Sequence, residues 1–533
     1  MPVRKPFSIR PGISLLVLLI IVSTSTLRSQ NQNLSGGLVF DGEPYIAINP
    51  QNPQHMVVAW MGYVFQQRIC IKTRISSDGG KNWNSAVTIP HVDENYTSAD
   101  PSLAFDGEGN LFISYIDHND ETAGAVFTRK SADGGLSWGE AVPVIYFDSD
   151  PGKLPIDRPW ISIDRSNGPN HGTIYITTMN AKGADGPPYH PYLTTSTDQG
   201  ATFGQWRTVD STGWLSGSLI SRPMPAPAVS SSGTFHCVYP SYVLSQGILP
   251  CYILASSSNA GIGFSYRNVL SAPGSVAVTD TSAKKGYLLR ANPANPDELA
   301  FLHLSNEYGD SDVICRISLD EGETWNDGTR VNDDNPGNGR MQDLVWAAYD
   351  QDGDLAVTWR DRRNAPDTGY AASYEFYGAV KLKNSDTFSP NFRISDLQVP
   401  FDDLLFSNGN DFMCCEMQND TITVVWGDTR NGKLNIWLQR SKTDGTLLSS
   451  QKLSEEKLPE FSVIQSGDNT LIIRSSRIRS CSLYSAKGEL VHRQSPKNPA
   501  DEILLDTQSL PSGLYVITAF TAYGPVKSVI LVR

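Results

Sequence analysis

The sequence contains no convincing amphipathic helix. Across its 533 residues, apolar side chains occur instead in short runs rich in β-branched residues, and these runs are bounded by Gly, Asn, Asp and Pro. Such runs are typical of strands joined by hairpins. The sequence therefore predicts an all-β protein.

Basic residues are scarce relative to acidic ones. The chain has 43 Lys and Arg against 56 Asp and Glu, a formal net charge of −13. Without the four basic residues of residues 1–29, the count is 39 against 56, a net charge of about −17. A chain of this sign repels nucleic acid and anionic membranes. We expect neither as a partner.

Cysteine is also rare, with seven residues in the chain. Cys237 and Cys251 are close enough in sequence to pair across one hairpin, so one or two disulfides at most are expected. The vicinal Cys414 and Cys415 are more typical of buried packing than of redox chemistry. No spacing resembles a zinc site, and acidic glycine turns such as residues 352–354 are typically plain hairpins. We predict no metal and no cofactor.

Only one long apolar run is present, at residues 13–22. The basic residues Arg4, Lys5 and Arg10 precede it, and small residues follow at 23–29. This arrangement is typical of a secretory signal peptide. A run of ten residues is too short to span a bilayer. We therefore expect residues 1–29 to be removed on export, leaving no membrane span.

One eight-residue turn occurs five times with the pattern Ser-x-Asp-x-Gly-x-x-Trp. Its serines are 55, 65, 61 and 61 residues apart. The third position of the turn is expected to accept backbone N–H bonds, the glycine to adopt a positive φ, and the aromatic residue to pack into apolar surface. Eroded copies begin near Ser385 and Ser441. The residues at the third position are Asp78, Asp133, Asp198, Asn259 and Asp320.

A second repeat has the same stride. Each unit begins with an ionisable residue, followed by an apolar run, a small polar turn and a second apolar run, as in residues 43–60 and 100–115. The ionisable residues at or near these starts are Glu43, Asp100, Asp157, Arg158, Arg222, Arg290, Asp343 and Asp411.

These turns resemble the Asp-box, or bacterial neuraminidase repeat, of β-propellers in the sialidase superfamily. The resemblance implies that each turn joins the third and fourth strands of a blade, away from the ligand face, so that its role is structural. A stride of about 60 residues suits four strands with long loops. We count seven blades, with six as the alternative.

In a propeller the innermost strands line the central axis. The eight ionisable residues are therefore expected to converge there as a mixed-charge ring. Such a ring either binds or hydrolyses sugars, or closes the tunnel by mutual salt bridges. Two Trp-x-Asp-x-Arg segments, at residues 359–363 and 426–430, lie beside it. Their recurrence favours loop bracing by Asp–Arg pairs over ligand contact by Arg363 or Arg430.

A sialidase, by family resemblance, uses three arginines on the substrate carboxylate, an Asp as acid/base and a Tyr nucleophile paired with a Glu; this Tyr chemistry is an exception among glycosidases. The family's first arginine is missing here, because residues 42–46 read Gly-Glu-Pro-Tyr-Ile. Arg158, Arg222 and Arg290 are the replacement candidates for the three arginines. Asp100 is the candidate acid. Tyr308 with Glu307 is the candidate nucleophile pair, and residues 374–375 are a second Tyr–Glu neighbour pair.

The chain changes character after about residue 458. The residues of this part predict hairpins with Lys-Gly and Ser-Gly turns. These hairpins are expected to form an accessory β-sandwich. Residues 510–515, Leu-Pro-Ser-Gly-Leu-Tyr, and the Lys-bearing last strand also resemble the type A sorting domain of type IX secretion substrates. That resemblance implies the type IX machinery as a partner. The predicted domains are a signal peptide (1–29), a propeller (30–457) and a β-sandwich (458–533).

Three hypotheses of function remain open. The first is a secreted or outer-membrane-surface hydrolase of exo-sialidase type that acts on a glycan or glycoprotein. The second is a non-catalytic module that binds glycan or protein with the same face. The third is a scaffold whose charged ring is fully self-paired.

Overall fold

The computed structural model describes residues 31–37, 40–64, 68–119, 123–243, 248–271, 286–401, 409–448, 462–466, 470–485, 490–521 and 524–532. These residues form strands and turns, which confirms the all-β prediction. Within these ranges no helix is long and apolar enough to cross a membrane. The predicted signal peptide, the domain boundary near residue 458 and the Lys-Gly turn at residues 487–488 lie outside the described residues.

Six antiparallel sheets have four strands each, paired in chain order. The first three sheets contain β2 (Asp41–Ile48), β3 (Met56–Tyr63), β4 (Ile69–Ser76) and β5 (Val87–Thr88); β6 (Thr97–Phe105), β7 (Leu111–His118), β8 (Gly124–Ser131) and β9 (Val142–Tyr146); and β10 (Asp157–Ile163), β11 (Ile174–Met179), β12 (Tyr192–Ser196) and β13 (Arg207–Thr208).

The next three sheets follow the same plan. They contain β14 (Ala226–Val229), β15 (Phe235–Val243), β16 (Ile248–Ser257) and β17 (Ser265–Ser271); β18 (Tyr287–Ala291), β19 (Leu299–Ser305), β20 (Asp312–Ser318) and β21 (Thr329–Arg330); and β22 (Gln342–Tyr349), β23 (Leu355–Asp361), β24 (Glu375–Lys381) and β25 (Phe392–Arg393).

A seventh sheet joins the two ends of this part of the chain. It contains β26 (Cys414–Gln418), β27 (Thr421–Asp428) and β28 (Asn435–Lys442). Two short strands, β1 (Gln32–Asn33) and β29 (Leu447–Leu448), pair with β28. The register places β1 opposite Trp437 and Leu438, and β29 opposite Arg440 and Ser441. The outer edge of this sheet is therefore shared by the first and last strands of the ring.

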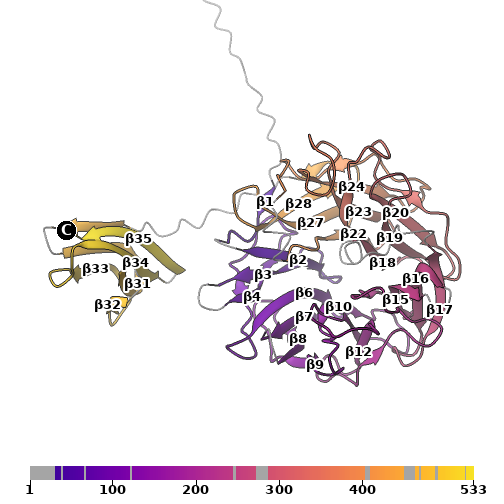
Figure 1. Cartoon of the computed structure of the whole chain (residues 1–533), viewed down its shortest axis with the longest axis horizontal. Helices are drawn as coiled ribbons and strands as arrows, with labels where there is room; N and C mark the ends of the chain where they lie inside the picture. Colours follow the sequence, from indigo (N-terminus) through magenta and orange to yellow (C-terminus); the bar gives the residue numbers. More distant parts are fainter. Residues whose placement is uncertain are drawn as a thin grey trace, which may run out of the picture.

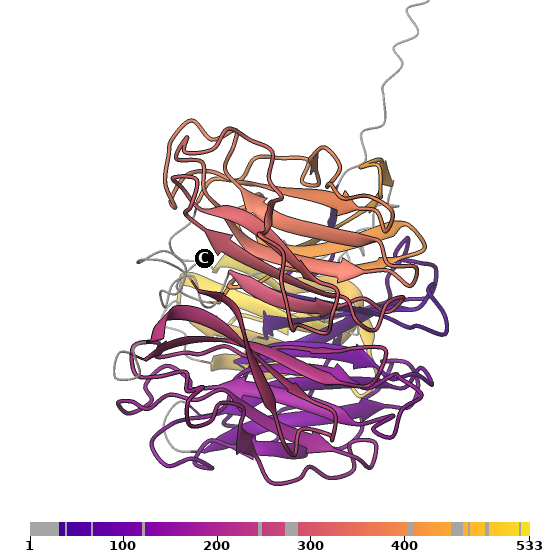
Figure 2. The ribbon, with the colours of Figure 1, turned by 90° about the vertical axis from the view of Figure 1, so that its right-hand side faces the viewer.

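These sheets have a propeller-like arrangement (Figure 1). The innermost strands β2, β6, β10, β14, β18, β22 and β26 contact one another in that order, and β26 contacts β2. Figure 2 shows the same sheets from the rim. Because strands alternate in direction, the innermost strands begin at the face where the second strands end. We call this face the upper face, and the opposite one the lower face.

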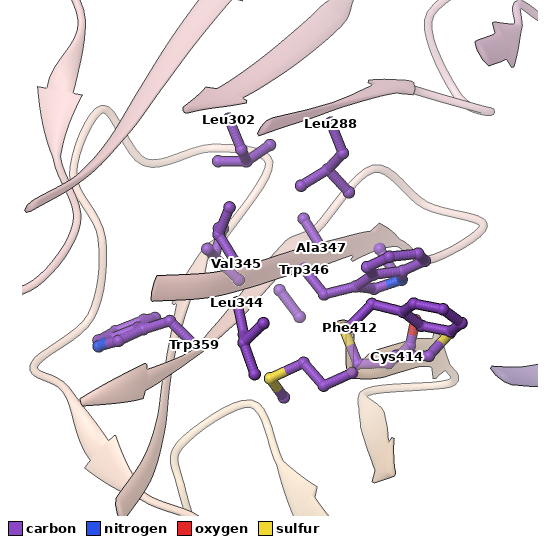
Figure 3. Packing of buried hydrophobic residues seen from close by; sticks show 14 of the residues in the cluster. Leu288, Leu302, Leu344, Val345, Trp346, Ala347, Trp359, Phe412 and Cys414 are labelled. Carbon is purple, nitrogen blue, oxygen red and sulfur yellow. The ribbon is translucent and has the colours of Figure 1, made fainter. Parts of the chain in front are cut away.

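The apolar side chains pack between neighbouring sheets. Figure 3 shows Leu288 of β18 and Leu302 of β19 facing Val345 and Ala347 of β22, with Phe412 and Cys414 beyond them. The described part of β22 is almost wholly buried. A sheet with both faces covered explains why the inner strands read as continuous apolar runs rather than alternating ones.

The five repeated turns join the third and fourth strands of their sheets and so lie on the lower face. In every copy the serine hydroxyl accepts the glycine N–H at 2.7–2.9 Å. The Asp or Asn Oδ1 accepts a backbone N–H four residues on, at 2.8–3.0 Å. The glycines have φ of 77–98°. These are the local bonds and backbone angles that the sequence predicts.

The aromatic residue of each turn packs against a core cluster. Trp83 is 7% exposed, and Trp138, Phe203, Phe264 and Trp325 are partly buried against the apolar clusters beside their own turns. The eroded copies near Ser385 and Ser441 occupy the same place, between β24 and β25 and between β28 and β29. The aromatic residue of the turn thus packs the outer edge of each sheet against the core.

The carboxyl-terminal residues form a separate six-stranded sheet with its own apolar cluster. The long strand β31 (Thr470–Ser485) pairs with β30 (Ser462–Ser466) and β33 (Ala500–Asp506) through its first half. Its second half pairs with β32 (Leu490–Gln494) and β34 (Gly513–Thr521), and β34 pairs with β35 (Gly524–Val532). Figure 1 shows this sheet beside the ring.

All seven cysteines are buried. The expected hairpin pair does not form a disulfide, because the register of β15 and β16 places Cys237 opposite Ala255 and Cys251 opposite Ser241. The two thiols are thus four residues out of register.

The free energy of unfolding should depend on pH through the ionisation of Asp198 in the third repeated turn. The hydroxyl and backbone N–H of Thr202 hold the pKa of this carboxyl down, to about 2. A depressed folded pKa contributes stability above the unfolded value, and this stability is lost as pH falls through about 2. Asp198→Asn should keep the turn, as Asn259 does in the fourth copy, and flatten the decline in unfolding free energy below pH 4. Asp198→Ala should cost about 1–2 kcal/mol at pH 7.

Urea unfolding followed by tryptophan fluorescence between pH 2.5 and pH 7 measures both effects. The exposed Glu140→Ala is the matched control. An Asn variant with the same acid sensitivity as the wild type contradicts this account.

Candidate functional site

Four innermost strands carry the same irregularity where they begin at the upper face. The register shifts between Gly42 and Tyr45, Ala99 and Ser102, Asp157 and Trp160, and Asp343 and Trp346. A bulge of this kind redirects a side chain. The residue within each bulge has a left-handed backbone, which is uncommon outside glycine. These residues are Glu43 (φ 53°), Asp100 (51°), Arg158 (57°) and Leu344 (50°).

The bulges bring Glu43, Asp100 and Arg158 together with Asp411. We call these four residues the axial charge cluster. The Arg158 backbone N–H donates to Asp100 Oδ2 at 3.2 Å, and Arg158 Nη2 donates to Asp411 Oδ2 at 3.2 Å. Arg158 belongs to the third sheet and Asp411 precedes the first strand of the seventh. Since these sheets are not neighbours in the ring, their contact crosses its centre.

Arg158 is surrounded by carboxylates. Burial alone would lower its pKa, but Asp100, Glu43, Asp411 and Asp157 raise it above the usual value. Burial raises the pKa of Glu43 well above its usual range, and Asp100 adds to this through its charge and a shared hydrogen bond. Burial and the neighbouring Asp100 thus favour the protonated form of Glu43, and Asp157 and Asp411 also lie near Arg158. By formal count, the cluster has three carboxyl groups and one guanidinium group.

Three buried polar atoms of this cluster have no hydrogen-bond partner among the described residues. They are Glu43 Oε2, Arg158 Nε and Arg158 Nη1. Buried polar groups are almost always hydrogen-bonded in folded proteins. Asp411, with a side chain 18% exposed, and Asp100, at 10%, connect the cluster to the upper face. The cluster therefore has unused donors and an unused acceptor close to solvent.

Aromatic side chains fill the ring directly beside the cluster. Trp160 contacts Tyr45, Trp346 and Phe412, with ring centroids 5.7, 5.8 and 5.0 Å away. The Arg158 guanidinium lies 4.9 Å from the Phe412 ring centroid. These side chains line a cavity of about 60 Å³. That volume holds a water or two but not a monosaccharide, so a sugar can meet the cluster only from the upper face.

The other predicted arginines are held elsewhere. Arg290 Nε donates to Ala347 O at 2.7 Å, and its guanidinium lies 5.1 Å from the Trp346 ring centroid. It lines the same small cavity. Arg222 is half-buried, and its carbonyl accepts the N–H of Met224 at 2.9 Å.

Asp343 lies in a second ion cluster. Arg360 Nε donates to Asp343 Oδ1 at 2.6 Å, and Arg362 Nη1 donates to the same oxygen at 3.2 Å. Burial alone would raise the pKa of Asp343, but the two guanidinium groups hold it well below its usual range. All three side chains are buried. Asp343 therefore neutralises arginines of its own sheet, and the bulge position beside it belongs to Leu344.

The Trp-x-Asp-x-Arg segments brace loops, as the sequence favours. Trp359 Nε1 donates to Asp361 Oδ2 at 2.7 Å, and Arg363 Nη2 donates to the same oxygen at 2.8 Å. Arg363 also donates to Asp333 and Asn391. In the second segment, Arg430 donates to Asp428, Asn31 and Asp396. Neither guanidinium is free to receive a ligand carboxylate.

The predicted Tyr–Glu pair is exposed. Glu307 and Tyr308 lie in the turn between β19 and β20, with Tyr308 44% exposed and 6.0 Å from the Arg330 guanidinium. The groups that face Arg158 and Asp100 come from other sheets. In the alternative pair, Tyr374 is buried, and Glu375 binds Asn364 and Arg393.

Among the described residues, one set of carboxylates has ligand atoms within 4.8 Å of one another, namely Asp350, Asp354 and Asp420. Asp350 Oδ1 accepts the backbone N–H groups of Asp352 and Asp354 at 3.2 and 3.1 Å. Asp354 Oδ1 accepts the N–H of Lys383 at 2.7 Å. These bonds are those of a hairpin turn.

One feature of the sequence marks Glu43, Asp100 and Arg158 as equivalent positions. Each directly precedes a proline, as Arg222 does, whereas Asp343 precedes Leu344. Pro disfavours the helical region for the residue before it, and a bulge also accommodates its missing N–H. The following proline therefore distinguishes these positions from Asp343.

Glu43 and Asp343 should respond to neutralisation in opposite ways. A carboxyl with a raised folded pKa stabilises below its unfolded pKa, and this contribution is lost as pH rises through the folded value. Glu43→Gln should therefore match the wild type at pH 4 and exceed its unfolding free energy at pH 8. Asp343→Asn should lower it by about 3–5 kcal/mol at pH 7, because two buried arginines lose their counter-ion.

Denaturant titrations at pH 4 and pH 8 distinguish the two, with Asp444→Asn in an exposed turn as control. A destabilised Glu43→Gln at pH 8 would show that this carboxyl is ionised in the folded protein.

Comparisons with known proteins assign no family. No family model matches the chain, and no curated protein matches it. Similar solved structures include a protein of unknown function from Dyadobacter fermentans (12% identity, 78% of this chain and 98% of that chain, TM-score 0.40). The α-L-arabinanase of Penicillium chrysogenum complexed with arabinobiose is 11% identical over 78% of this chain and 99% of its own, with a TM-score of 0.42. The NanB sialidase of Streptococcus pneumoniae is 14% identical over 78% and 70%, with a TM-score of 0.38. At these TM-scores the likeness assigns no activity to this chain.

Proposed function

We propose that this chain is an exported, seven-bladed propeller that binds hydroxyl-rich glycans at its upper face, over the axial charge cluster. The blades are the seven sheets around the ring. Glycan binding is supported best by one observation, the unmatched Glu43 Oε2, Arg158 Nε and Arg158 Nη1. A hydroxyl both donates and accepts hydrogen bonds, so the hydroxyls of a sugar match this mixed set.

The charge of the cluster favours a neutral sugar. Asp100, Asp157 and Asp411 face a single Arg158. An acidic sugar brings a further negative charge to this mouth, and like charges repel most strongly where solvent is limited. Arg222 and Arg290 are also not part of the cluster. The arrangement thus supports binding of neutral glycans over the three-arginine recognition of a sialic acid carboxylate.

Hydrolysis is the second candidate function, and one observation favours it. The pKa of Glu43 is raised well above its usual range by burial and by the neighbouring Asp100. Carboxyl groups with separated pKa values are the usual acid and base pair of glycosidases. However, the two share a hydrogen bond, whereas the carboxyls of retaining enzymes are about 5–5.5 Å apart. Two carboxyl groups in hydrogen-bond contact are better placed to share a proton than to attack a sugar between them.

We also propose that export and delivery follow the resemblances at the two ends of the chain. Residues 1–29 are removed as a signal peptide. Residues 458–533, which include the sheet of β30–β35, are then recognised by type IX secretion machinery, and residues 30–457 are delivered to the outer surface or released. The separate apolar cluster of this sheet supports an independent unit.

Binding should depend on Asp411, the most exposed of the cluster's carboxylates. Asp411→Asn removes the carboxylate that binds Arg158 and should weaken binding to a neutral glycan about tenfold, because a hydrogen bond to a charged group is worth roughly 1.5–3 kcal/mol. A glycan array with neutral and sialylated glycans, followed by calorimetry on the best neutral ligand, measures this. Asp444→Asn on the lower face is the control.

The same preparation incubated with sialyl-lactose and with neutral oligosaccharides tests hydrolysis. Turnover that Asp100→Asn abolishes supports the second candidate. Preference for sialylated glycans on the array, or unchanged affinity of Asp411→Asn, rules out the proposed site.

Delivery should require residues 458–533. In a host that has type IX secretion, a chain truncated after residue 457 is expected to remain in the periplasm, whereas the full chain reaches the surface or medium. Cell fractionation with mass spectrometry of the mature amino terminus measures both events. Surface delivery of the truncated chain contradicts the sorting role.

A further inference from the structure

Three side chains from two neighbouring sheets form a chain of contacts at the upper face, away from the axial charge cluster. Cys70 lies at the start of β4, His91 in the connection from β5 to β6, and Asp117 near the end of β7. Cys70 Sγ lies 3.2 Å from His91 Nε2. His91 Nδ1 lies 2.8 Å from Asp117 Oδ1. A thiol, an imidazole and a carboxylate thus occupy the relative positions of nucleophile, base and orienting group.

Asp117 is held rigidly. Its side chain is fully buried, its Oδ2 accepts the N–H of Val92 at 2.7 Å, and its Oδ1 accepts the hydroxyl of Ser98 at 2.9 Å. With His91 Nδ1 directed at a carboxylate, Nε2 is the nitrogen left to accept a proton from the Cys70 thiol. Asp117 is therefore a positioning residue.

Other charged groups approach the segment that carries His91. Arg129 Nη2 donates to Pro90 O at 3.1 Å, and Arg68 Nη1 donates to Asn95 O at 2.7 Å. On the adjacent strand, Lys72 pairs with Asp41 at 3.6 Å. Burial raises the pKa of Tyr96, as do the charges of Asp93 and Asp117. The carboxylate in contact with the imidazole is Asp117, and the nearby guanidinium groups bind backbone carbonyls.

The environment of Cys70 differs from that of the other cysteines. Burial raises the pKa of Cys251 and Cys481 to about 11, and that of Cys315 and Cys415 to about 12. Those thiols are inert because the thiolate is the nucleophile. Cys315 is as deeply buried as Cys70, each being 1% exposed. It therefore serves as an internal comparison with the same exposed fraction.

We propose that Cys70 is an oxidation site, a thiol activated by His91 for reaction with small hydroperoxides. The thiol proton moves to His91 Nε2, and the thiolate sulfur attacks one oxygen of the peroxide. An S–O bond forms and the O–O bond breaks. The leaving hydroxide takes the proton from His91 and becomes water. Sulfur is oxidised by two electrons to a sulfenic acid, and the peroxide is reduced.

The burial of Cys70 limits the size of the oxidant that can react with it. Cys70 is 1% exposed and the His91 side chain 9%, while the adjacent Val92 is 45% exposed. The thiol thus lies just below the upper face, and the proposal requires an oxidant as small as hydrogen peroxide. A chain that acts outside the cytoplasm meets such oxidants without the thiol reductants of the cytosol.

The full-length protein treated with hydrogen peroxide in the presence of dimedone tests the proposal. Peptide mass spectrometry should find Cys70 trapped about tenfold or more faster than Cys315, the scale of general-base assistance. His91→Gln should reduce the Cys70 rate to that of Cys315. Cys315→Ser, the matched control, should leave the Cys70 rate unchanged. Asp117→Asn should shift the pH midpoint of trapping upward.

The ratio of the trapping rates at Cys70 and Cys315 distinguishes local reactivity from unfolding, because global unfolding exposes both thiols. Equal rates at Cys70 and Cys315 in the wild-type protein overturn the proposal without any variant. A Cys70 rate that His91→Gln leaves unchanged overturns it as well, and shows that access rather than the imidazole sets the reactivity.

Discussion

The structure depends on the contact between the last sheet of the ring and the first. Each sheet buries its faces only against its neighbours, so the last sheet must meet the first or both leave apolar surface in water. β26 contacts β2, and the short strands β1 and β29 lie along β28. Asn31 secures this junction, since its Nδ2 donates to Ile394 O at 3.0 Å and to Gln439 Oε1 at 2.9 Å. These contacts then fix where the innermost strands begin.

The propeller-like arrangement places many charged groups at one end of the inner strands, and the protein neutralises them in separate clusters. Asp343 with Arg360 and Arg362 is satisfied within one sheet. Arg363 and Arg430 are paired with carboxylates at the ends of β23 and β27. Arg158 differs because it reaches across the ring to Asp411 and keeps two nitrogens without a hydrogen-bond partner among the described residues. A buried group of this kind is costly, and the proposed glycan site depends on this feature.

Local features of this protein could be predicted, and non-local ones could not. The repeated turns form as expected because Asp78 and its equivalents bind backbone atoms within four residues. The bracing of Arg363 by Asp361 is equally local. By contrast, the partner of Asp343 lies seventeen residues away in the next strand. The one-residue displacement between Asp343 and Leu344 arises from a bulge that only strand pairing creates. The Cys70–His91 contact likewise joins a strand and the connection between two sheets.

The sequence by itself determined the all-β class, the repeating unit and the chemistry of its turns, because hydrophobic pattern and turn bonding act over a few residues. It also identified Glu43, Asp100, Arg158 and Asp411 as residues near the starts of inner strands. Only the tertiary structure decided that these four meet while Asp343, Arg290 and the Glu307–Tyr308 pair bind elsewhere. The reason is geometric: which side chains face one another at the axis depends on register, bulges and the order of sheets around the ring, and none of these is encoded within a single turn.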